Sequence, residues 1–144
     1  MTVRCISLGV VNVAIWSGVP SIQDADDVSR AVQDHARRIG RKIVLVGILA
    51  DGCKMPDEKV RGRMGALWPI LIDASSTVQF VNMTKGFVAA RMISLLVSVF
   101  ALGQRGQVQI HQTLLPALQE AGRADPGIDV TALHKRIAAE MATV

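Results

Sequence analysis

The pattern of hydrophobic and polar positions alternates between short apolar runs and helical spacings along most of the chain. Two segments rich in β-branched residues, Val3 to Ser7 and Val10 to Trp16, predict a hairpin or a bent strand. The run from Lys42 to Leu49 is almost continuously apolar, which is typical of a central strand covered on both faces. Further strands are predicted at Thr77 to Val81 and at Val108 to His111.

Between these strands, apolar residues recur at helical spacing, which predicts helices there. The first predicted helix begins after Ser21, which forms a capping-box pattern with Asp24, and it stops at Gly40. A second helix follows Asp57, a suitable N-cap residue. Proline inside a helix removes a backbone hydrogen bond, so we expect a kink or an early end at Pro69.

The most apolar stretch runs from Phe87 to Leu102. A membrane-spanning helix needs about 20 apolar residues, and this shorter stretch also contains Arg91. Arg91, Ser94 and Ser98 draw one narrow polar stripe along the predicted helix. We therefore expect a core helix that is buried on most of its sides, and no membrane segment.

The last part of the chain predicts two helices separated by a linker. Thr113 can cap a short helix from Leu114 to Ala121, and the linker covers Gly122 to Gly127. A final amphipathic helix carries a narrow apolar stripe formed by Val130, Leu133, Ile137 and Met141. This stripe can fold back on its own domain or pack against a second copy. We expect the second arrangement, a homo-oligomer and most simply a dimer.

The order of elements predicts the fold class. Alternating strands and helices form an α/β domain with a mixed, largely parallel sheet and helices packed on its faces. The domain is expected to cover residues 1–122, and residues 123–144 supply the linker and the appended C-terminal helix. A chain of 144 residues can bury one core of this kind without disulfides or metals.

Charge and cysteine content restrict the class of partner and the compartment. The net charge is +4, but the densest basic cluster, His35 to Lys42, lies where positive charge complements the end of a helix dipole. With three Phe, two Trp and no Tyr, the chain lacks stacking platforms, so we do not expect nucleic-acid binding. Cys5 and Cys53 are far apart, and no secretory leader is recognisable. We expect reduced thiols and a cytoplasmic location.

No pattern for a catalytic, metal or cofactor site is present in the sequence. The three histidines fall on separate predicted elements, and no serine lies in a GxSxG elbow. The histidines and cysteines lack the spacings of a metal site, and neither phosphate-binding glycine motif occurs. We therefore assign no catalytic residue, no metal and no cofactor.

The segment VQFVNMTKGFVAARMISLLVSVFALGQRGQVQIHQTLLPALQEAG, residues 78–122, carries a resemblance to a known family. It resembles the STAS superfamily, which includes anti-sigma-factor antagonists and the tails of sulphate transporters, and in particular its stand-alone bacterial members. In the antagonists, the loop between strand and helix usually has an Asp, then a Ser or Thr pair and a Gly. Here Asn82, Met83, Thr84, Lys85 and Gly86 stand in those places. The resemblance implies a regulatory module that binds another protein through this loop.

The same loop can bind an anionic group for a physical reason. A strand-to-helix turn presents free backbone N–H groups at the positive end of a helix dipole, and Lys85 adds a charge. Asn82, Thr84, Lys85 and Gly86 are therefore the candidate binding residues. The alternative for Thr84 is a purely structural role as the N-cap of the helix that follows.

The competing hypothesis is a small cytoplasmic enzyme. Asp51, Cys53 and Lys54 follow the central strand, and Thr84 follows the next strand. Because ligands bind outside the carboxyl ends of strands in open α/β sheets, these residues can surround a pocket. A closed polar pocket there favours an enzyme, whereas an exposed loop surface favours a protein partner.

Overall fold

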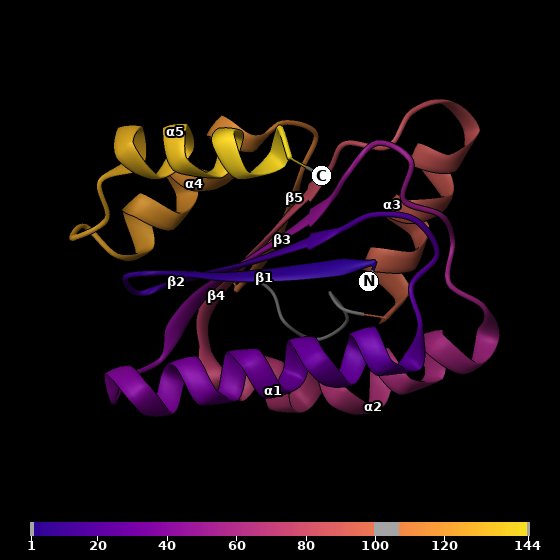
Figure 1. Cartoon of the computed structure of the whole chain (residues 1–144), viewed down its shortest axis with the longest axis horizontal. Helices are drawn as coiled ribbons and strands as arrows, with labels where there is room; N and C mark the ends of the chain where they lie inside the picture. The colour runs from indigo at the N-terminus through magenta and orange to yellow at the C-terminus, as the bar shows by residue number, and fades with distance from the viewer. Residues whose placement is uncertain (1, 100–106, 144) are drawn as a thin grey trace.

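The computed structural model describes residues 2–99 and 107–143 and contains a five-stranded sheet between two layers of helices (Figure 1). The strands are β1 (Val3–Leu8), β2 (Val11–Trp16), β3 (Ile43–Leu49), β4 (Ser75–Asn82) and β5 (Val108–His111). They lie in the order β1-β2-β3-β4-β5, and only β1 and β2 pair antiparallel. The predicted hairpin, the central position of β3 and the mixed, largely parallel sheet are confirmed.

The helices divide between the two faces of the sheet (Figure 1). They are α1 (Ile22–Ile39), α2 (Glu58–Ala74), α3 (Gly86–Val99), α4 (Leu114–Ala124) and α5 (Val130–Met141). Each of the three crossovers between β2 and β5 leads to the next strand in the same direction along the sheet. Because such crossovers are right-handed, the helices that they contain, α1, α2 and α3, all lie on one face. The other face is covered by α4 and α5. Among the described residues, no helix has both the length and the apolar content needed to cross a membrane.

The first two helices start where their capping residues predict. Ser21 and Asp24 form a complete capping box, and the Asp57 carboxylate accepts a hydrogen bond of 2.9 Å from the Val60 backbone N–H. Of the two outcomes expected at Pro69, a kink or an early end, the early end is wrong, because α2 continues to Ala74. Trp68 and Leu71 on either side of the proline are buried. Burial of these two side chains offsets the cost of a proline inside a helix, about 3 kcal/mol for the lost hydrogen bond and the clash of the ring with the preceding turn.

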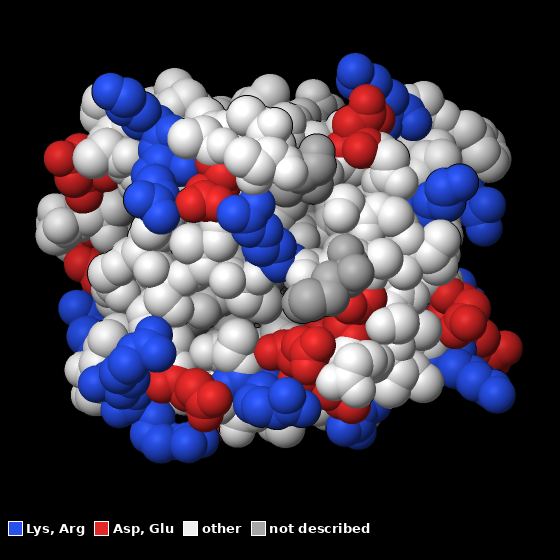
Figure 2. Space-filling model, viewed as in Figure 1, with Lys and Arg blue, Asp and Glu red and all other residues white. Residues whose placement is uncertain are grey.

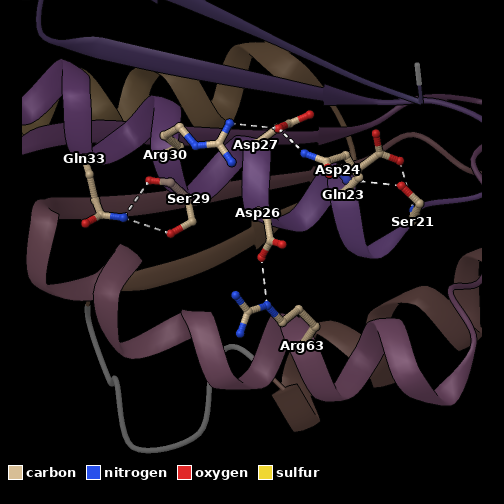
Figure 3. A network of polar contacts seen from close by, with 9 residues as sticks. All are labelled: Ser21, Gln23, Asp24, Asp26, Asp27, Ser29, Arg30, Gln33 and Arg63. Carbon is tan, nitrogen blue, oxygen red and sulfur yellow. Dashed lines mark hydrogen bonds and ion pairs between the residues drawn. The ribbon is translucent and has the colours of Figure 1, made fainter.

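Helices α1 and α2 also contact each other on their outer side (Figure 3). The Arg63 side chain of α2 donates to the Asp26 carboxylate of α1 at 2.7 Å. Elsewhere on the surface, acidic and basic side chains are interspersed on the face shown in Figure 2. The positive net charge is therefore not gathered into one basic patch on that face.

The C-terminal helix packs on its own domain. Leu133 and Ile137 are buried in one cluster with residues of β2 and β3, and Glu140 forms an ion pair with Arg4 on β1. The expectation that α5 covers its stripe on a second copy is therefore wrong. Gly122 lies inside α4 and not in the linker. A Cβ atom there would come within 2.8 Å of the Val130 side chain, so this glycine permits the close approach of α5.

His35 is buried, and both of its ring nitrogens have polar partners. Its Nε2 lies 2.7 Å from the Gly9 carbonyl oxygen, and its Nδ1 lies 3.2 Å from Asn12 Nδ2. With Nε2 protonated and donating to the carbonyl, Nδ1 accepts from the Asn12 amide. The pair ties the inner side of α1 to β2.

Candidate functional site

The carboxyl ends of β3 and β4 bring two loops together at one edge of the sheet. The backbone N–H of Met83 donates to the Leu49 carbonyl oxygen at 2.9 Å, and Lys85 Nζ lies 3.5 Å from a carboxylate oxygen of Asp51. This contact follows from the parallel pairing of the two strands. The structure thus brings the loop after Leu49 next to the loop from Asn82 to Gly86, as the sequence order predicts.

Asn82 organises the second loop. Its Oδ1 accepts hydrogen bonds from the Thr84 hydroxyl at 2.5 Å and from the Thr84 backbone N–H at 3.3 Å. Its Nδ2 donates to the carbonyl oxygen of Ala89, one turn into α3, at 3.0 Å. Both Asn82 and Thr84 are buried. One side chain therefore fixes the path of the loop and the start of the helix.

Thr84 is not the N-cap of α3, so this alternative is wrong. The helix begins two residues later at Gly86, whose φ of 65° is in the left-handed region that favours glycine. The Thr84 hydroxyl points inward to Asn82 instead of toward the helix N–H groups. The exposed part of the loop is formed by Lys85 and Gly86.

Helix α3 is much more exposed than its sequence predicts. Met92, Leu95 and Leu96 are buried, whereas Phe87 is 80% exposed, and Val88, Ile93 and Val97 are also exposed. The expectation of a helix buried on most sides is wrong for the described part, and residues 100–102 lie outside it. Among the described elements, α3 contacts mainly α2 and β4, which cover one of its sides.

A cavity of about 70 Å³ lies between the sheet and the three helices of that face. Its lining is almost entirely apolar, and none of the described lining residues is an Asp, a Glu or a His. Cys53 lines it, and burial raises the pKa of this thiol to about 11. A buried thiol that stays protonated near neutral pH is not an activated nucleophile. A pocket thus occurs near the predicted strand ends and is lined by Cys53 and Lys54, but no carboxylate or imidazole is among its described lining residues.

The polar residues elsewhere form structural contacts. His111 Nε2 lies 2.7 Å from Gln79 Oε1, and Gln79 Nε2 donates to the Thr77 hydroxyl. Burial lowers the pKa of His111, with a smaller opposite effect of Glu120. Within residues 2–99 and 107–143, no group of three or more His, Cys, Asp or Glu side chains is placed to hold a metal ion.

Comparison with known proteins identifies the fold. The arrangement matches, with a TM-score of 0.52 and 19% sequence identity, the crystal structure of an anti-sigma factor antagonist from Mycobacterium paratuberculosis. The match covers 82% of this chain and 91% of that one. The fold is therefore the STAS-like fold that the sequence resemblance predicts. No family model matches the chain, and no curated protein matches it.

The structure adds one residue that sequence reasoning missed. Phe87 follows the candidate loop directly and is the most exposed of the large hydrophobic residues in the described chain. The sequence predicts a core position for Phe87 because the whole stretch around it is apolar. The spacing of polar and apolar residues in this helix does not predict that the side carrying Phe87 is exposed.

Proposed function

We propose that this protein is a non-catalytic regulatory module that binds a protein partner with the surface formed by Lys85, Gly86 and the exposed side of α3. We call this the loop–α3 surface; its apolar side chains are Phe87, Val88, Ile93 and Val97. The observation that carries the proposal is the 80% exposure of Phe87 beside the loop. Exposed apolar groups that gather on one element mark interaction sites more often than scattered ones do.

The chemistry of the surface fits a protein partner. Aromatic side chains supply much of the binding energy at protein interfaces when a partner covers them. Phe87 is held on a helix whose start is fixed by Asn82, so little order has to be gained when it binds. Lys85 and Arg91 add exposed positive charges at the rim. Such rim charges steer an acidic partner surface and set its orientation.

The fold match supports the same class of function. The solved structure with this fold is named for its action against an anti-sigma factor, which is itself a protein. The proposal does not involve phosphorylation of Thr84, because its hydroxyl is buried and donates to Asn82. Recognition is assigned instead to the exposed neighbours of that residue.

The test compares two exposed apolar residues on opposite faces of the sheet. Three proteins are used as bait: the wild-type chain, Phe87→Asp and Leu115→Asp. The proteins that each bait captures are quantified by mass spectrometry and compared. Leu115 lies on α4 and is also exposed, so it is the matched control. A partner that is retained by Leu115→Asp and lost with Phe87→Asp, and then binds the purified wild-type chain, supports the proposal. Equal retention by both variants would contradict it.

A further inference from the structure

The cavity on the α1–α3 face is lined mostly by buried residues. All of its lining residues are buried except two, Trp16 and Lys54, so these two mark the opening. The Lys54 backbone N–H donates to the Gly18 carbonyl oxygen at 2.7 Å, which ties the loop after β3 to the loop after β2. The opening therefore lies at the carboxyl ends of the strands, where open α/β sheets bind ligands.

The interior of the cavity suits a hydrocarbon group. Its floor is formed by small and apolar residues of the sheet, including Ala14 and Gly47, and its walls include Met64 of α2 and Met92 of α3. Methionine side chains adapt their shape to what they contact. A volume of about 70 Å³ is roughly half of the 150 Å³ of an engineered cavity that binds benzene. A short length of alkyl chain fits this space better than a ring.

The charge at the opening indicates the chemistry of the ligand's head group. Lys54 is the only charged residue among the described lining residues, and its ammonium group forms no ion pair within the described part of the chain. Asp51, the nearby acid, pairs with Lys85 instead. We propose that the cavity binds the alkyl end of a small amphiphile whose carboxylate head group pairs with Lys54 at the opening.

Octanoate is a suitable probe, used below the concentration at which it forms micelles. The methyl groups of ¹³C-methyl methionine report binding by NMR, because Met64 and Met92 line the cavity whereas Met141 packs on the opposite face. We expect saturable shifts of the Met64 and Met92 methyl signals and none at Met141. Absence of saturable shifts at Met64 and Met92, or equal shifts at all three methyl groups, would overturn the proposal.

Variants separate the two parts of the site. Lys54→Met keeps the apolar stem and should weaken octanoate binding about two- to fivefold, the range of an exposed ion pair, without changing the binding of uncharged octanol. Lys59→Met, an exposed lysine outside the lining, should leave octanoate binding unchanged. Equal octanoate affinity of the wild type and Lys54→Met would overturn the role of Lys54.

The cavity itself is tested by filling it. Ala25→Leu adds three carbons from α1 and should weaken the binding of both octanoate and octanol at least tenfold. Ala14→Val, from the sheet, is the second variant if Ala25→Leu does not fold, and it should also weaken both ligands. Unchanged affinity in a folded filling variant would overturn the proposal. If phosphatidylglycerol vesicles shift the Met64 and Met92 methyl signals and octanoate does not, the ligand is a membrane lipid and not a free carboxylate. That result would also contradict the proposal.

Discussion

The side-chain amide of Asn82 donates to the carbonyl oxygen of Ala89, seven residues further along the chain, at 3.0 Å. The bond uses an amide donor at the position where the anti-sigma-factor antagonists that the segment resembles usually have an Asp. A carboxylate at this position would direct a lone pair, not a donor, at the Ala89 carbonyl. The loop of this protein is therefore built around a neutral side chain.

We predict that Asn82→Ala lowers the free energy of unfolding by about 1–3 kcal/mol, because it leaves the polar groups of buried Thr84 and the carbonyl of half-buried Ala89 without this partner. Asn82→Asp should also be destabilising, since it keeps the acceptor but loses the donor. Urea denaturation measures both effects. An Asn82→Asp variant as stable as the wild type would show that the bond to Ala89 is not important.

We predict that Thr84→Glu strongly destabilises the fold, because it places a charged side chain at a buried position. Thr84→Val removes only the hydroxyl bond to Asn82 and should cost about 1 kcal/mol. Thermal unfolding followed by circular dichroism compares the two. If Thr84→Glu melts at the wild-type temperature, then Thr84 is not buried in solution.

The contact between His35 and Asn12 makes a separate prediction. His35→Phe should cost about 1–3 kcal/mol, since it leaves the buried Asn12 amide without its partner and also removes the bond to the carbonyl of the exposed residue Gly9. The double variant His35→Phe with Asn12→Val should recover part of that loss, because it removes the unpaired amide as well. Chemical denaturation of the single and double variants tests this. If the stability lost in the double variant equals the sum of the losses in His35→Phe and Asn12→Val, then the two residues are not coupled.

Stability should fall in acid partly through Asp24. Burial alone would raise the pKa of Asp24, but hydrogen bonds from Thr2 and Ser21 outweigh it, so the pKa is lowered. A lowered pKa in the folded state stabilises the protein above the unfolded value of about 3.9, and this contribution is lost as the pH falls through the folded value. We therefore expect the unfolding free energy of Asp24→Asn to depend less on pH below about 5. Asp73→Asn, an exposed residue, controls for the loss of one carboxylate. Equal acid dependence of the wild type and Asp24→Asn would contradict the assignment.

Much of the fold could be predicted from the sequence because its signals are local. The run at β3 and the capping box of Ser21 with Asp24 need only neighbouring residues to be read. The early end expected at Pro69 is wrong because the sequence shows the local cost of the proline, but not how much the packing of Trp68 and Leu71 stabilises the helix. The packing of the C-terminal helix was not predictable for the same reason, since the apolar cluster that buries Leu133 and Ile137 also contains residues of α4, β2 and β3.

The candidate site was only partly predictable. The order of strands and loops is enough to place Asp51 near Lys85. The bond from Asn82 to Ala89 and the inward direction of Thr84 depend on the loop conformation, which no periodicity encodes. The apolar residues of α3 occur on all of its sides, so the sequence does not indicate that Phe87 faces solvent.

Hydrogen exchange of the complex with a captured partner tests the central claim most directly. Backbone amides that a partner covers exchange more slowly, so the protected segment locates the interface. We predict that the partner slows exchange at residues 84–98, in the loop and along α3, and leaves residues 114–124 of α4 unchanged. Protection confined to α4 or α5, with the loop–α3 surface exchanging as in the free protein, would contradict the proposed function.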